Sequence, residues 1–229
     1  MPANTDHEKS LAAKAAVQLV KNNQVIGLGT GSTAAFAVYE IAQMVQNGLQ
    51  VQAVATSEHT AALATSLGIP IIDINTVDQI DITIDGADEF TKELQLMKGG
   101  GGALLREKIV ASLSTQVVII ADSSKLVNRL GKFTLPIEII PFASNYVLHQ
   151  LKKIQGTGNI RTSAGKTFIT DSGNYIMDTD FGLIENPQQL ADTLNSIVGI
   201  VEHGLFINLA TSVIMGSGDD VKIFAQPQQ

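Results

Sequence analysis

The sequence predicts an α/β protein, with a mainly parallel, doubly wound, Rossmann-like sheet and a second, smaller α+β domain of ferredoxin-like type. Two observations support the parallel sheet. Short apolar runs alternate with helical patterns through residue 125, which is typical of such sheets. Three of these runs end in polar residues, at the edge where open α/β sheets bind ligands. The smaller domain is predicted because a β-α-β-β-α-β order follows Gly131.

The composition is that of a globular protein with one or two domains. The chain has 229 residues, 45% of them hydrophobic, a formal net charge of −7 and no cysteine. Without cysteine there are no disulfides, thiol nucleophiles or zinc–thiolate sites, and the four histidines lack metal-ligand spacing. The acidic charge without a basic stripe argues against nucleic-acid binding. No apolar run has transmembrane length and no signal peptide is visible, so we expect a soluble cytoplasmic protein.

The chain is expected to open with a helix from Thr5. The segment Thr5-Asp6-His7-Glu8 has the spacing of a capping box, and apolar residues then recur with helical period as far as Val20. Because this pattern gives one apolar face, we expect the helix to serve packing.

An apolar strand at 25–29, a glycine turn and a second helix follow. This arrangement can bind an anion, because the N–H groups at a helix start point toward it. A dinucleotide-binding motif is the alternative, but Ser32 stands where its third glycine belongs, and residues 48–51 offer no acid for a ribose. The hydroxyls of Thr30, Ser32 and Thr33 suit a small sugar phosphate better.

The strongest signal is a strand at 80–84, a polar loop, four glycines at 99–102 and a helical pattern from Ala103 to Ser114. Consecutive glycines cost backbone entropy. A flexible linker is one explanation, but the position between Lys98 and a patterned helix favours close approach of the backbone to an anion. The loop is not of Walker A type, since no Gly-Lys-Ser/Thr follows it.

Acidic residues flank this loop. Asp85, Asp88 and Glu89 follow the strand end, where they can meet a ligand, although capping and solvation of the loop would also explain them. Glu107 lies off the apolar stripe that we predict for the next helix, at residues 105, 109 and 113. It is either part of a solvated face or a carboxylate near the glycine loop that can move protons.

Residues 116–121 are almost wholly apolar, which predicts a strand covered on both faces. It ends in Asp122-Ser123-Ser124-Lys125, and we expect the three polar strand ends to converge on one cleft. For Lys125 a solvated loop position is the alternative. The segment 212–224 is expected to return to the first domain. Its turn at 216–220 is a weak functional candidate that we interpret mainly as a hairpin.

The smaller domain is assigned to residues 131–205, and the larger, catalytic domain to 1–130 plus 206–229. In the smaller domain we expect a β-rich stretch at 132–141, helices at 144–154 and 186–197, and strand-like stretches at 160–178 and 198–207. Asn186-Pro187 is a good helix start, and Asp171 to Asn174 has the composition of a hairpin turn.

Several of these segments together resemble the type A ribose-5-phosphate isomerase family. They are DGADE at 85–89, KGGGGAL at 98–104 and REK at 106–108, together with TGST at 30–33 and ADSSK at 121–125. The resemblance covers nearly the whole chain. It implies interconversion of D-ribose 5-phosphate and D-ribulose 5-phosphate, in the non-oxidative pentose phosphate pathway, without a metal or organic cofactor. It also suggests a homodimer or homotetramer.

The resemblance further implies residue roles. Glu107 matches the family's catalytic glutamate, which moves a proton between C1 and C2 of a cis-enediolate, while Lys98 and the glycine amides are suited to stabilise the enediolate oxygen. Asp85 is the candidate for ring opening, with Asp88 orienting hydroxyls. The implied substrate contacts are Thr30, Gly31, Ser32, Thr33, Asp85, Gly86, Ala87, Asp88, Lys98, Gly99, Gly100, Gly101 and Lys125.

Two other classes stay open on the sequence. A CoA transferase or a deaminase-like enzyme with a shared fold is the first, and a CoA transferase would use Glu107 as a nucleophile. A non-enzymatic sugar-phosphate-binding regulator is the second. Such regulators usually carry a DNA-binding segment, and the chain shows no basic N-terminal arm.

Overall fold

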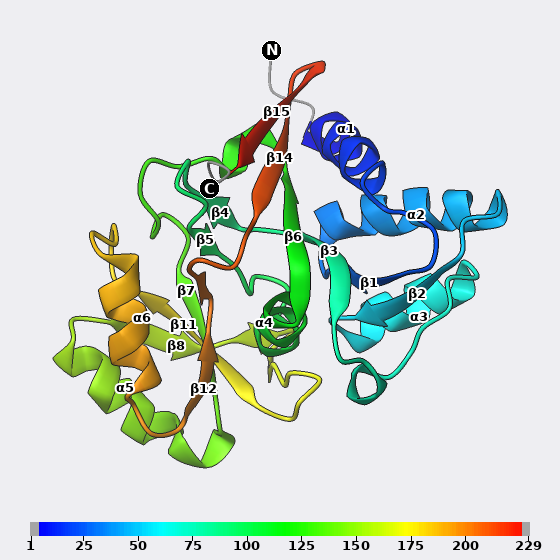
Figure 1. Ribbon diagram of the computed structural model, residues 1–229. Coiled ribbons are helices and arrows are strands. Elements are labelled where there is room, and N and C mark those ends of the chain that lie inside the picture. Colours follow the sequence, from blue (N-terminus) through cyan, green and yellow to red (C-terminus); the bar gives the residue numbers. More distant parts are fainter. Residues whose placement is uncertain (1–4, 226–229) are drawn as a thin grey trace.

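A six-stranded, mainly parallel sheet is the framework of the larger part of the molecule (Figure 1). The computed structural model describes residues 5–225. The sheet has the order β15-β14-β6-β3-β1-β2, and its pairs are parallel except for β14 with β15. This confirms the predicted fold class. The strands are β1 (Gln24–Leu28), β2 (Val51–Ala55), β3 (Ile80–Gly86), β6 (Ser114–Ala121), β14 (Ser212–Ser217) and β15 (Asp220–Ala225).

Helices and a small sheet cover the two faces of this sheet. One face packs against α1 (Thr5–Val17), α2 (Ser32–Gln46) and α3 (Glu58–Ser66). The other face packs against α4 (Leu104–Ser112) and a three-stranded sheet of β4 (Glu89–Phe90), β5 (Leu96–Met97) and β13 (Leu205–Phe206). Strand β6 is buried on both sides, because Val118 and Ile120 join the first core and Val117 and Ile119 join the second, as its unbroken apolar run predicts.

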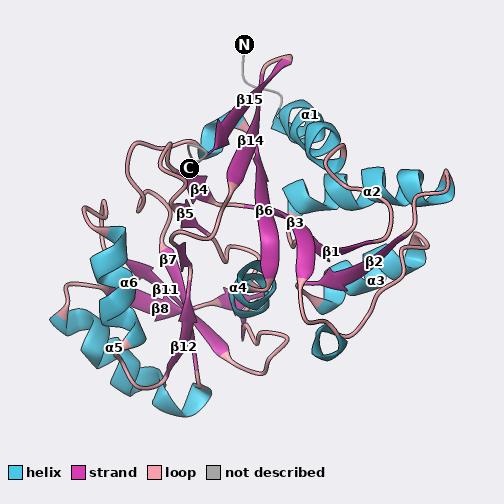
Figure 2. Cartoon of the chain, viewed as in Figure 1, coloured by secondary structure: helices cyan, strands magenta, loops and turns pink. Residues whose placement is uncertain are grey.

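The second large sheet is antiparallel and has the order β12-β7-β11-β8. Its order and its two helices are ferredoxin-like, as predicted, and Figure 2 shows both helices on the same side of the sheet, where they share one apolar core. The domain limits at 131 and 205 stay a prediction. The elements are β7 (Leu135–Ile139), α5 (Ser144–Lys153), β8 (Thr157–Ile160), β11 (Tyr175–Asp180), α6 (Pro187–Asn195) and β12 (Ile200–His203), with a short hairpin of β9 (Thr162–Ser163) and β10 (Lys166–Thr167). Three short 3₁₀ helices complete the described chain, at Ile74–Thr76, Ser123–Lys125 and Pro141–Ala143.

Helix α1 also forms hydrogen bonds to distant segments of the chain. Its Glu8 is buried, and its carboxylate accepts hydrogen bonds from the N–H and hydroxyl of Ser123, both at 2.8 Å, and from the N–H of Gly218 at 2.8 Å. The glutamate of the predicted capping box therefore ties α1 to the end of β6 and to the β14–β15 turn. This use of the turn supports its interpretation as a hairpin.

The predicted apolar stripe of α4 is wrong. Ile109 is 48% exposed, and the buried face carries Leu104, Glu107, Val110 and Ala111 instead. A carboxylate can occupy a buried helix position when a cation compensates its charge. Glu107 has such a partner, so the helix turns this residue inward rather than toward solvent.

Candidate active site

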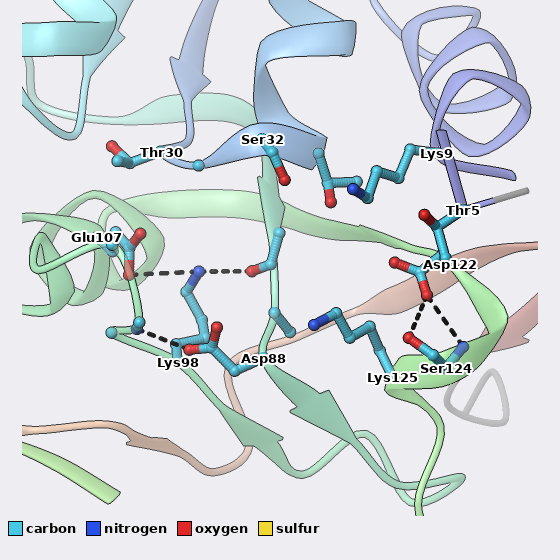
Figure 3. A pocket seen from close by; sticks show the side chains of 17 residues that line it. Thr5, Lys9, Thr30, Ser32, Asp88, Lys98, Glu107, Asp122, Ser124 and Lys125 are labelled. Atoms are coloured by element: carbon cyan, nitrogen blue, oxygen red, sulfur yellow. Dashed lines mark hydrogen bonds and ion pairs between the residues drawn. The ribbon is translucent and has the colours of Figure 1, made fainter. Parts of the chain in front are cut away.

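A cavity of about 270 Å³ opens beside the carboxyl ends of β1, β3 and β6 (Figure 3). Its lining brings together the three polar strand ends and the glycine loop, as predicted from the sequence. Every catalytic or substrate-contact residue that the family resemblance implies lines it except Asp85, whose Oδ2 is 3.0 Å from the Lys98 ammonium. The lining residues are Thr5, Lys9, Thr30, Gly31, Ser32, Thr33, Gly86, Ala87, Asp88, Lys98, Gly99, Gly100, Gly101, Glu107, Asp122, Ser124 and Lys125.

At one end of the cavity, the ammonium group of Lys98 lies between two carboxylates. Its Nζ is 3.0 Å from Asp85 Oδ2 and 3.3 Å from Glu107 Oε2. The three residues are only 2–3% exposed. In such a low-dielectric position, each charge requires the others, so the trio is held as one unit.

The chain positions Asp85 through main-chain donors. Asp85 ends the buried strand β3, and its Oδ1 accepts hydrogen bonds from the N–H groups of Gly86 at 2.7 Å and Thr30 at 3.1 Å. Gly29 is required here, because a Cβ at that position would lie 2.0 Å from Asp85 Oδ1 and 2.5 Å from Asp85 Cα. The contact of the β1 and β3 ends therefore depends on a glycine.

Contacts hold both the main-chain N–H and the side-chain ammonium group of Lys98. Its N–H donates to Gly204 O at 2.8 Å, and its ammonium also donates to Gly86 O. The same ammonium lies 5.4 Å from the centre of the Phe206 ring, a distance at which a ring face attracts a cation. These contacts hold the charge at the cavity wall.

Glu107 has an oxygen with unused hydrogen-bonding capacity. Its Oε2 contacts Lys98 as an ion pair but accepts no hydrogen bond from any described residue. Asp85 Oδ2 forms the same kind of ion pair with Lys98, but Asp85 Oδ1 also accepts two main-chain hydrogen bonds. Of these two buried acids, Glu107 is the one that lines the cavity, so it is the one placed to exchange a proton with a bound ligand.

Burial controls the electrostatics of the trio. It raises the pKa of Asp85 and Glu107, although Lys98 lowers both in part, and repulsion from Asp85 adds to the rise at Glu107, whose pKa reaches about 8. For Lys98, burial lowers the pKa, but the charges of Asp85 and Glu107 outweigh it and hold the pKa above its ordinary value. Lys98 thus stays an ammonium, while Glu107 can exchange a proton near neutral pH.

The glycine loop faces Asp88. The N–H of Gly100 donates to Asp88 Oδ2 at 2.8 Å, and a Cβ at Gly100 would lie 2.5 Å from Asp88 Oδ1. Gly99 has φ +104°, in the region that favours glycine. The loop is therefore an ordered wall of the cavity rather than a flexible linker.

The opposite end of the cavity is basic and rich in hydroxyls. Helix α2 begins at Ser32 without a side-chain cap, and its first N–H groups can meet an anion. Figure 3 shows the side chains of Lys9 and Lys125 both extending into the cavity near this helix start. Together these groups form a candidate anion subsite.

Three details differ from the sequence-based expectation. Glu89 is not in the cavity, because its carboxylate accepts hydrogen bonds from the N–H groups of Gly131 at 2.8 Å and Phe133 at 2.6 Å. The Thr30 hydroxyl is engaged by a hydroxyl cluster, 2.7 Å from Thr56 Oγ1 and 2.9 Å from Ser57 Oγ. The sequence reasoning also missed Thr5 and Lys9, since their helix gave only a packing pattern.

Within the described residues, no group of three or more His, Asp or Glu side chains is arranged to hold a metal ion. The place between the Asp85 and Glu107 carboxylates is taken by the Lys98 ammonium. Among residues 5–225, no helix has the length and apolar character needed to cross a membrane.

This combination of fold and site is typical of enzymes that act on small phosphorylated ligands, because it joins proton-transfer groups to an anion subsite at strand ends. Comparisons with known proteins define the class further. Residues 52–220 match the sequence profile of the family described as ribose 5-phosphate isomerase A, or phosphoriboisomerase A. The chain belongs to this family.

Individual relatives agree over almost the full chain. Ribose-5-phosphate isomerase A of Sphingopyxis alaskensis is 47% identical over 216 residues, which are 94% of this chain and 95% of the relative. That of Limosilactobacillus reuteri is 48% identical over 217 residues, which are 94% and 96% of the two chains.

Solved structures agree as well. Ribose 5-phosphate isomerase A of Methanocaldococcus jannaschii has a TM-score of 0.92, 39% identity and coverage of 98% of this chain and 100% of that one. A D-ribose-5-phosphate isomerase in complex with phospho-erythronic acid has a TM-score of 0.95, 36% identity and coverage of 98% and 100%.

Proposed function

We propose that the protein interconverts D-ribose 5-phosphate and D-ribulose 5-phosphate through an enediolate. The observation that carries this proposal is the Asp85–Lys98–Glu107 trio at one end of a cavity whose other end holds Lys9, Lys125 and the start of α2. A basic phosphate subsite and a proton-transfer group in one cavity suit a short phosphorylated sugar. A related isomerase structure contains phospho-erythronic acid, which supports a phosphorylated ligand here.

The proposed chemistry uses one base. Glu107 takes the proton from C2 of the open-chain aldose, the electrons of that C–H bond form the C1=C2 double bond, and the C1 carbonyl oxygen becomes negative. Glu107 then returns the proton to C1, while the C2 hydroxyl gives up its proton to O1 and C2 becomes the carbonyl. A carboxyl whose pKa burial raises to about 8 can perform both transfers near neutral pH.

The enediolate oxygen needs a fixed positive environment. The Lys98 ammonium and the glycine-loop N–H groups line the same cavity as Glu107, and preorganised donors in a site without bulk water stabilise developing charge strongly. No step in this scheme requires a metal or an organic cofactor, in line with the sequence-based expectation, which stays a prediction.

Lys9 and Lys125 are proposed to bind the phosphate. The variants Lys9→Gln and Lys125→Gln are each expected to raise KM by about tenfold to a hundredfold, since a hydrogen bond to a charged group contributes about 1.5–3 kcal/mol. The value of kcat should change much less, because the subsite lies away from Glu107. Steady-state kinetics with ribose 5-phosphate measures both constants. Lys222→Gln, at an exposed lysine, is the control, and an unchanged KM in both cavity variants would place the phosphate elsewhere.

Ring opening is assigned to Asp85, with Asp88 orienting hydroxyls. Asp88 lines the cavity, whereas Asp85 does not and contacts Lys98 and two main-chain N–H groups, so the two acids can be separated by experiment. If Asp85 opens the ring, Asp85→Asn should slow conversion of the cyclic substrate about 10²-fold and more than Asp88→Asn does. The opposite order in single-turnover kinetics would transfer the role to Asp88.

We further propose a cytoplasmic homodimer or homotetramer that acts in the pentose phosphate pathway. This rests on the family resemblance, and light scattering of the purified protein measures the oligomeric state directly.

A further inference from the structure

Arg161 lies outside the cavity lining, immediately after β8 of the antiparallel sheet, yet it contacts the glycine loop. Its Nη1 donates to Gly99 O at 2.9 Å and to Gly100 O at 3.1 Å. Its Nε donates to Asp178 Oδ2 at 2.9 Å, and its Nη2 donates to Asp178 Oδ1. The guanidinium thus joins a carboxylate on β11 to two loop carbonyls.

These contacts determine where the loop amides point. In a trans peptide group the C=O and the N–H point in opposite directions, and the described chain has no cis peptide bond. Gly99 C=O shares its peptide group with Gly100 N–H, and Gly100 C=O shares its group with Gly101 N–H. Because Arg161 holds both carbonyls on its own side, both N–H groups point away from it.

The structure shows the result of this orientation. Gly100 N–H donates to Asp88 Oδ2, in the cavity wall, at 2.8 Å. Gly101 also lines the cavity, and within residues 5–225 its N–H has no hydrogen-bond partner. An N–H in this position is available to an oxygen of a bound ligand.

One internal hydrogen bond, from Gly102 N–H to Gly99 O at 3.0 Å, holds the glycine loop, and Arg161 adds an external restraint. Each residue loses about 1–2 kcal/mol of backbone entropy when it is fixed, and glycine has the widest choice of conformations. A guanidinium is suited to the task, because its planar fork binds a carboxylate with two hydrogen bonds and keeps a third nitrogen for other acceptors. The side chain of Arg161 is 14% exposed, so water competes little for these contacts.

We propose that Arg161 is a positioning residue of the active site. It holds the carbonyls of Gly99 and Gly100 so that Gly100 N–H donates to Asp88 and Gly101 N–H stays open to the substrate, and Asp178 holds Arg161 in turn. The antiparallel sheet thereby helps to set the geometry of the glycine loop, whose Gly100 N–H donates to Asp88 in the cavity wall. The kinetic part of this inference rests on the proposed isomerase function.

The first test is the variant Arg161→Lys, which keeps the charge but cannot bind Asp178 and both carbonyls in the same fork. It is expected to lower kcat about 10²-fold, the usual effect of a small displacement of catalytic groups, and to change KM much less. Asp178→Asn should lower kcat about tenfold, since the arginine remains but its anchor weakens. Arg129→Lys, at an exposed pair with Glu185, is the matched control and should retain full activity.

Two readouts separate positioning from general stability. Hydrogen exchange of the Gly100 amide, which donates to Asp88, should be faster in Arg161→Lys, while the exchange of β3 and β6 stays unchanged. Guanidinium ions should restore part of the activity of Arg161→Ala. Full kcat in Arg161→Lys, or a loss of activity with unchanged loop exchange and no rescue, would overturn the proposal. If the wild type shows no isomerase activity, the proposed function is wrong. Hydrogen exchange of the loop then still tests whether Arg161 positions the glycine loop.

Discussion

Glu107→Gln is expected to lower kcat by about 10²–10⁴-fold, the range that a positioned acid–base group contributes. The substitution keeps the size of the side chain but removes the group that accepts the C2 proton. Glu107 carries an oxygen without a hydrogen-bond donor among the described residues, and burial, partly offset by Lys98, raises its pKa to about 8. Both features suit a base that takes up and returns a proton.

Steady-state kinetics measures the effect of Glu107→Gln on kcat, and calorimetry measures its effect on the binding of ribose 5-phosphate. Substrate binding should persist, because the phosphate subsite is untouched. The matched control is Glu93→Gln, at an exposed glutamate outside the cavity, and it should behave as the wild type. Wild-type kcat in Glu107→Gln would remove the base from this position and make Asp85 the next candidate.

Lys98→Met is expected to affect both activity and stability. Activity should fall about 10²–10³-fold, as when a donor to a developing oxyanion is removed. The free energy of unfolding should fall by about 3–5 kcal/mol, because the variant leaves buried carboxylates without their cation. Lys98 contacts both Asp85 and Glu107. It is therefore the one residue of the trio whose replacement leaves two buried carboxylates without a counter-ion.

The pH dependence of this loss of stability has a defined sign. Burial raises the pKa of Asp85 and Glu107 even with Lys98 present, and removing the ammonium raises both further. For a carboxyl whose pKa is higher in the folded state, stability is present below the unfolded pKa and is lost as the pH rises through the folded pKa. Urea unfolding should therefore show a larger deficit for Lys98→Met at pH 8 than at pH 5. Lys92→Met, at an exposed lysine, controls for loss of charge, and a pH-independent deficit would contradict this explanation.

Local patterns in the sequence predicted the framework of the site. Strand ends, the glycine loop and the start of α2 follow from short-range signals, and parallel strands bring their carboxyl ends to one edge. This is why Asp88, Lys98 and Lys125 could be placed together before the structure. The same signals wrongly grouped Glu89 with the site, because a strand-end acid can equally bind main-chain N–H groups of another segment.

The remaining features depend on contacts between distant segments. Lys9 reaches the cavity because Glu8, next to it, is bound by Ser123 and Gly218, and nothing in the helical period of α1 indicates this. Glu107 is buried because Lys98 compensates its charge. The hydrophobic periodicity of the helix cannot reveal such a pairing. The contact of Arg161 with the glycine loop is likewise invisible in the sequence, since it joins residues about 60 positions apart.

Glu107 is proposed to carry one proton between C2 and C1 without a metal. The most direct test follows ribose 5-phosphate deuterated at C2 during conversion by the purified protein in EDTA, with wild type and Glu107→Gln compared. The wild type should form ribulose 5-phosphate with part of the deuterium at C1, because a base that is 3% exposed exchanges slowly with solvent, and Glu107→Gln should lose both conversion and transfer. Undiminished conversion by Glu107→Gln, or wild-type activity that EDTA abolishes and a metal restores, would contradict the claim.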